Sequence, residues 1–171
     1  MIEKKLVRHA PLVLSMVFGL LSTALPTLSM AQGAITFKNI CSMVGPNSPE
    51  VLGDRDGHTF RVSLATCRVE GGPLAGGVMD TSVLWESDKE GTTALSGDGV
   101  IRKSGATTAY RLLDGKQTLV MKDGKVVGWT SPGKGVYTMA TGSVAALSGK
   151  TFSWNAHPTA AREYVIDVTM D

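Results

Sequence analysis

The stretch "TTAYRLLDGKQTLVMKDGKVVGW", residues 107–129, alternates apolar and polar side chains around two Asp-Gly pairs. Tyr110 and Leu112 fall on one face of an extended chain, because successive side chains of a β-strand point to opposite faces. The Asp-Gly pairs at 114–115 and 123–124 have the composition of two-residue hairpin turns, in which both central residues take positive φ. The stretch therefore predicts three antiparallel strands joined by two tight hairpins.

The same alternation recurs along the chain after Gln32. In residues 59–64, Phe60, Val62 and Leu64 are predicted to face a core, and further Asp-Gly turns are predicted at 56–57 and 98–99. The C-terminal run places four large side chains on one face, namely Tyr164, Ile166, Val168 and Met170. This part of the sequence contains no convincing amphipathic helix, so the pattern is typical of an all-β protein.

The number of strands suggests which all-β fold is formed. Apolar runs between turn signals give about eight to ten strands, with few residues left over. A small antiparallel β-barrel of about eight strands is the fold class that we predict. A β-sandwich is the alternative, because it shows a similar strand spacing.

Residues 1–31 have the three parts of a secretory signal peptide. The basic residues of its n-region are Lys4, Lys5 and Arg8. An uncharged apolar run over 12–25 follows, and Ser29 and Ala31 place small residues at the −3 and −1 positions of a cleavage site. The alternative, a retained signal anchor, needs about 20 apolar residues to span a bilayer, more than this run supplies. We expect a periplasmic or secreted protein without stable membrane insertion after cleavage, and a single mature domain over 32–171.

Removal of this segment changes the charge balance. The full chain has 17 basic and 15 acidic residues, and the segment contains three of the former and one of the latter, so 14 of each remain. A neutral chain lacks the clustered Lys and Arg that nucleic-acid binding requires. The mature histidines, His58 and His157, are far apart and lack a metal-binding spacing. We expect both at the surface, no metal site and no cofactor.

The two cysteines, Cys41 and Cys67, both belong to the mature chain. An even pair in an exported protein is most simply a disulfide, and no C-x-x-C spacing points to redox or metal chemistry. Closing a loop of this length stabilises the folded state by about 3.5 kcal/mol in the chain-entropy model. The sequence predicts a Cys41–Cys67 bridge.

A glycine-containing segment follows the predicted strand over 135–140, with Thr141-Gly142 at its start and Gly149 at its end. This segment resembles the T-G-x-[FY]-x-x-x-x-G segment of allene oxide cyclase-like and dirigent-like barrels. Val144 stands at the aromatic position of that segment. The resemblance implies an eight-stranded antiparallel barrel with an apolar cavity, and transfers no catalytic residue. The mature chain is also similar to a group of exported proteobacterial proteins, which implies export and no particular activity.

Five aromatic residues in different parts of the predicted sheet are candidates for a ligand site: Trp85, Tyr110, Trp129, Tyr137 and Trp154. Small barrels either fill their interior with such side chains or use them to line a cavity for one small ligand. Three charged residues within or beside strands are best placed to orient a ligand, namely Arg61, Glu86 and Arg111. Strand alternation nevertheless predicts that all three face solvent.

Three functions stay open at this point. An exported barrel that binds a small apolar molecule is the first, and a cofactor-free cyclase or isomerase of allene oxide cyclase-like or dirigent-like type is the second. The third is a filled barrel that acts as an envelope structural or interaction module. Whether the barrel interior is open or filled separates the third function from the other two, because only ligand binding and catalysis need a cavity.

We predict that export removes the first 31 residues. The mature protein recovered from the exported fraction should begin at Gln32, as measured by intact mass. A membrane-associated form that retains residues 1–31 would contradict the cleavage site.

Overall fold

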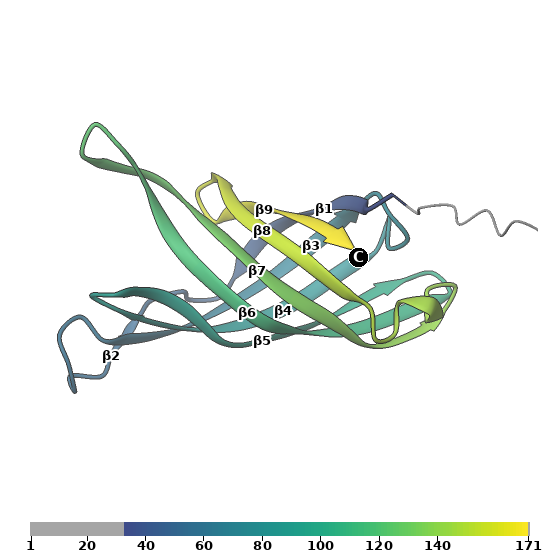
Figure 1. Ribbon diagram of the computed structural model, residues 1–171, viewed down its shortest axis with the longest axis horizontal. Coiled ribbons are helices and arrows are strands. Elements are labelled where there is room, and N and C mark those ends of the chain that lie inside the picture. Colours follow the sequence, from purple (N-terminus) through teal and green to yellow (C-terminus); the bar gives the residue numbers. More distant parts are fainter. Residues whose placement is uncertain (1–32, 171) are drawn as a thin grey trace, which may run out of the picture. The chain divides into compact units, whose positions relative to one another are not determined.

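The computed structural model describes residues 33–170, so the predicted signal peptide lies outside the described residues. This part of the chain forms antiparallel β-strands and one short 3-10 helix, η1 (Figure 1). The elements are β1 (Ile35–Val44), β2 (Glu50–Val51), β3 (Thr59–Glu70), β4 (Val78–Asp88), β5 (Gly91–Lys103), β6 (Ala106–Lys122), β7 (Lys125–Gly142), η1 (Ala145–Leu147), β8 (Thr151–Ala160) and β9 (Glu163–Met170).

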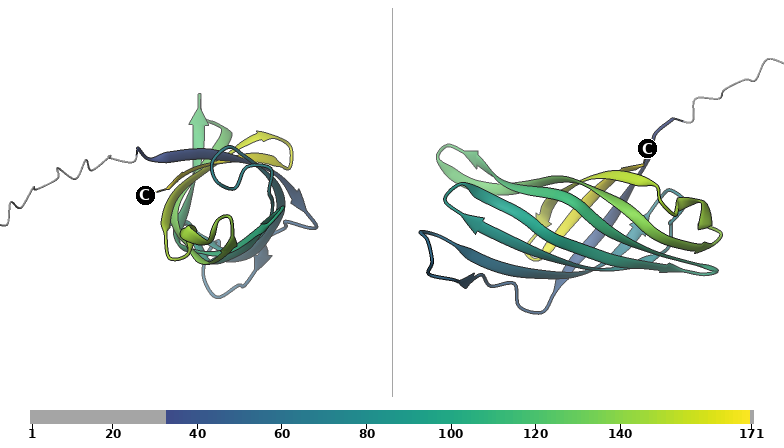
Figure 2. Two further views of the ribbon diagram at one scale, coloured as in Figure 1. Left: turned by 90° about the vertical axis from the view of Figure 1, so that its right-hand side faces the viewer. Right: turned by 60° about the horizontal axis from the view of Figure 1, so that its bottom comes forward.

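The strands close into a barrel. Neighbouring strands pair in the order β1-β9-β8-β7-β6-β5-β4-β3, and β1 pairs with β3 as well, so the eight strands form a ring (Figure 2). The two-residue β2 is an extra strand that pairs with the N-terminal end of β3, at Thr59 and Phe60. The prediction of an all-β barrel is confirmed, and the sandwich alternative is wrong because β1 bonds to both of its neighbours.

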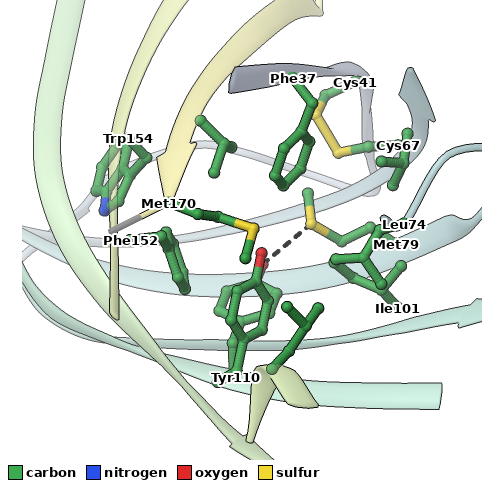
Figure 3. Packing of buried hydrophobic residues seen from close by; sticks show 14 of the residues in the cluster. Phe37, Cys41, Cys67, Leu74, Met79, Ile101, Tyr110, Phe152, Trp154 and Met170 are labelled. Carbon is green, nitrogen blue, oxygen red and sulfur yellow. Dashed lines mark hydrogen bonds between the residues drawn. A yellow bond between two sulfur atoms is a disulfide. The ribbon is translucent and has the colours of Figure 1, made fainter. Parts of the chain in front are cut away.

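A disulfide lies at the position where the ring closes. Cys41 of β1 is directly opposite Cys67 of β3, and the two sulfur atoms are bonded. Both side chains are buried and point into the barrel (Figure 3). The predicted bridge is confirmed, and it links the two strands whose pairing closes the sheet.

Only one of the two Asp-Gly pairs of the opening stretch is a hairpin turn. Asp123 and Gly124 have φ of 49° and 72° and join β6 to β7. The pair at 114–115 lies inside β6, at a register shift between Leu112 and Asp114. A β-bulge there bends the long strand without ending it, so the prediction of a turn is wrong. The predicted turn at 98–99 also lies within a strand, β5.

The alternation of apolar residues predicts the inner face of β6 and β9 and fails for β3. Tyr110 and Val168 point inward as expected, but Val62 and Leu64 are exposed on the outer surface. The inner face of this part of β3 carries the polar residues Arg61 and Ser63, which line the barrel interior. The prediction for β3 is wrong because the polar face of this strand borders a cavity instead of solvent.

One end of the barrel is filled by side chains from loops as well as strands. Leu74 of the β3–β4 loop is completely buried, and Val144 and Leu147 cover the interior from the β7–β8 connection. They belong to the same buried cluster as Met79 and Tyr110. Figure 3 shows Leu74 with these two residues. Toward the opposite end the inward-facing residues become progressively more exposed, so the interior opens there.

The β7–β8 connection changes direction at two glycines. Gly142 and Gly149 take φ of 62° and 79°, conformations that side chains other than glycine rarely adopt. A Cβ at Gly142 would also overlap the carbonyl oxygen of Gly105 in the β5–β6 turn, whereas a Cβ at Gly149 would meet no heavy atom within 4 Å.

This difference gives a matched pair of variants. Gly149→Ala should destabilise the fold by about 1–2 kcal/mol, the cost of the left-handed backbone. Gly142→Ala should cost at least about 1 kcal/mol more, because it adds a backbone overlap. Denaturant unfolding measures the free energy of unfolding of both variants. Lys150→Ala is the control, because its side chain is exposed, and it should change stability by less than about 0.5 kcal/mol. Equal losses in the two glycine variants would contradict the contact with Gly105.

Candidate functional site

The open part of the barrel contains a cavity of about 370 Å³. Its apolar end reaches Ile101 and Phe152, beside the filled end of the barrel. Its other end, here called the mouth, is lined by Asn47, Gln117 and Leu119, which are partly or fully exposed. The volume lies within the range of small-molecule sites in proteins.

All five aromatic residues singled out from the sequence line this cavity. They come from four different strands and meet because each occupies an inward position: Trp85 on β4, Tyr110 on β6, Trp129 and Tyr137 on β7, and Trp154 on β8. Trp129 is the only one of the five that is not buried, and it lies toward the mouth. Their role in binding a ligand stays a prediction.

Glycines on the inner face make room for these rings. A Cβ at Gly133 of β7 would lie 2.5 Å from the Trp154 ring, and a Cβ at Gly135 would overlap the Phe152 ring. Each ring therefore lies directly against the backbone of the neighbouring strand. The spacing Gly-x-Gly within a strand is the sequence signal for this arrangement, and the alternation of apolar residues alone does not reveal it.

The aromatic rings form two groups. Phe152 contacts Tyr137 and Tyr110 with centroid distances of 4.8 and 5.8 Å near the filled end. Trp129 contacts Tyr164 at 5.9 Å. Edge-to-face and tilted contacts of this kind fix ring positions, so the cavity wall is preformed.

Three buried side-chain atoms have no hydrogen-bond partner among the described residues: Asn39 Oδ1, Arg61 Nε and Trp154 Nε1. All three residues line the cavity. Buried polar atoms are nearly always hydrogen-bonded, so each such atom calls for an explanation. These residues therefore combine an unpartnered polar atom with a position in the cavity wall.

The three charged candidates occupy different environments. Arg61 is half-buried and lines the cavity, so the prediction that it faces solvent is wrong. Arg111 is exposed, as expected. Glu86 lies outside the cavity lining and accepts hydrogen bonds from Arg55 at 2.7 Å and from His58 at 2.9 Å, counting the histidine as donor.

The position of His58 also differs from the expectation of a surface residue. It is buried, and its ring nitrogens contact Asp54 at 2.5 Å and Glu86 at 2.9 Å. Arg55 bonds to Glu86 and Asp88 beside it, and these bonds with Arg55 and His58 lower the pKa of Glu86. The network attaches the loop between β2 and β3 to the end of β4, which is a structural role.

The described residues can be searched for a metal site and for a membrane-spanning helix, and the sequence can be compared with known proteins. Within residues 33–170, no group of three or more His, Cys, Asp or Glu side chains could hold a metal ion. The same residues contain no helix long and apolar enough to cross a membrane. No protein-family model matches the sequence, and no curated protein matches it either. The likeness to allene oxide cyclase-like and dirigent-like barrels stays a prediction.

The chain has three tyrosines, and burial in or beside the cavity raises the pKa of all of them. The pKa of Tyr164 reaches about 12, because desolvation disfavours the charged phenolate. Tyr110 donates a hydrogen bond to Thr81 Oγ1 at 2.7 Å, so its hydroxyl has a partner in the neutral form. At physiological pH all three phenols are neutral.

We expect the native protein to show little phenolate absorbance at pH 10–11, with Tyr164 ionising near pH 12 and the other two no earlier. In denaturant all three should titrate near their ordinary value of about 10. Because the unfolded chain then loses its protons first, the free energy of unfolding should fall as pH rises above about 10. Spectrophotometric titration and denaturant unfolding test this, and three native midpoints near 10 would contradict the burial of the rings.

Proposed function

We propose that the protein binds one small, largely apolar molecule in the barrel cavity. The observation that carries the proposal is the cavity of about 370 Å³, which is walled by aromatic side chains and has a few polar residues in its lining. Ligand sites have this composition, with an apolar wall and a few polar groups that fix orientation. The resemblance of residues 141–149 to cavity-containing barrels supports the same function.

The cavity volume limits the size of the molecule. At about 30 Å³ for each water-sized group, a cavity of about 370 Å³ holds on the order of a dozen non-hydrogen atoms. A medium-length alkyl chain or a small ring system is of this size. Folded peptides and larger lipids would extend beyond the mouth of the cavity.

We place this activity in the periplasm or outside the cell. The buried Cys41–Cys67 disulfide supports an oxidising compartment, because such bonds are rare in the cytosol. The predicted signal peptide supports the same location.

Binding accounts for the cavity better than the two alternatives. A cyclase or isomerase needs a group that moves a proton, and among the described lining residues there is no carboxylate or histidine. The lining tyrosines have raised pKa values, which makes them poor bases at neutral pH. A structural module needs a filled interior, whereas this interior is filled at one end only.

Titration with 1-decanol tests the proposal, because this alcohol has about the required size. All three tryptophans of the chain line the cavity, so intrinsic fluorescence should change and saturate as the alcohol binds. Ala156 is buried in the cavity wall, and Ala156→Phe should weaken binding at least about tenfold by occupying the space. Val62→Phe adds the same ring on the outer surface and should leave binding unchanged.

Circular dichroism and thermal unfolding establish that both variants keep the fold. A fluorescence change that does not saturate, or equal binding by Ala156→Phe and the wild type, would contradict a ligand site in this cavity.

A further inference from the structure

Arg61 extends from β3 across the barrel interior. Its Nη2 donates a hydrogen bond of 2.8 Å to Gln117 Oε1 of β6, a strand that does not neighbour β3 in the sheet. The Cζ atom lies 5.9 Å from the centroid of the Trp85 ring, whose residue is opposite Arg61 on β4. The guanidinium therefore sits within the cavity, at the side of the mouth.

No acidic side chain is found among the described residues that line the cavity with this guanidinium. Among the 24 described residues that line the cavity, Arg61 is the only one that is charged at neutral pH. Its Nε is buried without a hydrogen-bond partner in the described part of the chain. Gln117 and the Trp85 ring are neutral neighbours, so the positive charge has no counter-ion among these contacts.

A charge in such a place is costly unless an anion joins it. Arg61 is half-buried, so its guanidinium loses part of its hydration without gaining a charged partner, which disfavours the charged form. Burial accordingly lowers the pKa of Arg61, although an arginine stays protonated at neutral pH. Arg55 and Arg102 show the usual arrangement, since each contacts a carboxylate on the outer surface.

We propose that Arg61 binds the carboxylate of the ligand, so that the natural ligand class is a small monocarboxylic acid with an apolar body. The inference rests on the proposed function. The acid group lies at the mouth with Arg61 and Gln117, and the apolar body extends toward Phe152 at the inner end. Ser63 and Asn47, joined by a hydrogen bond of 2.8 Å, add polar surface beside the acid group.

The chemistry of the site favours a carboxylate over a phosphate. A planar guanidinium can donate two parallel hydrogen bonds to a carboxylate. The single positive charge of the described lining neutralises a monoanion and leaves a phosphate dianion with an uncompensated charge.

The competing explanation is that Arg61 is a structural tie between β3 and β6 through Gln117. The two explanations differ in the stability of the ligand-free protein. A structural tie requires that Arg61→Met lowers the melting temperature. If Arg61 instead serves to bind an anionic ligand, the melting temperature of ligand-free Arg61→Met should be unchanged or higher, because an apolar side chain replaces an uncompensated charge.

The experiment compares decanoate with 1-decanol, two probes of similar size that differ in charge. In the wild type at neutral pH, decanoate should bind about 10- to 150-fold more tightly, the usual range for a charge-assisted hydrogen bond. Arg61→Met should remove this preference and leave decanol binding within about threefold. Arg61→Lys keeps the charge without the planar fork and should retain part of the preference.

Arg111→Gln is the matched control, because it removes an arginine from the exposed outer side of β6. It should leave both affinities unchanged. Equal binding of the two probes by the wild type, or a preference that survives Arg61→Met, would overturn the inference and leave the proposed function standing. Failure of both probes to bind would overturn both. A fall of more than about 5 °C in the melting temperature of Arg61→Met would identify a structural tie and overturn the inference.

Discussion

Strand β1 hydrogen-bonds to β9 along one edge and to β3 along the other, and this double pairing leaves the barrel with no free edge. The register of this closure decides which side chains of β1 point inward together with those of β3, because a shift of one residue would turn the inner face of the shifted strand outward. Cys41 and Cys67 occupy opposite positions at this closure, and their bond holds the register that the hydrogen bonds define. The cavity, its aromatic wall and the position of Arg61 all depend on that register.

The interior changes in character along the barrel axis. At one end, rings and loop side chains meet glycine backbones and fill the space, as Trp154 does against Gly133. At the other end polar side chains replace them, and the outer surface of the same strands becomes apolar, as at Val62. An eight-stranded barrel is wide enough to be filled or to hold one small molecule, and this chain does each in one half.

The fold class and the aromatic wall could be predicted from the sequence because they follow from local rules. Alternation identified the inner face at Tyr110, and cysteine number gave the disulfide. The same rule failed at Arg61, since alternation finds two faces and does not say which one borders a cavity. The turn predicted at 114–115 failed because a bulge in a long strand has the same composition as a hairpin. The burial of His58 depends on contacts with β4 that no local pattern reveals.

The covalent link between β1 and β3 also bears on the kinetics of exchange. A barrel can release its contents through an end or, when two paired strands separate, through its wall. The pair of β1 and β3 is one such place in the wall. Here that place is crosslinked, with both sulfurs buried. On the proposed function, a ligand that leaves by the mouth passes side chains such as Trp129 and Leu119, whose rearrangement is faster and more local than strand separation.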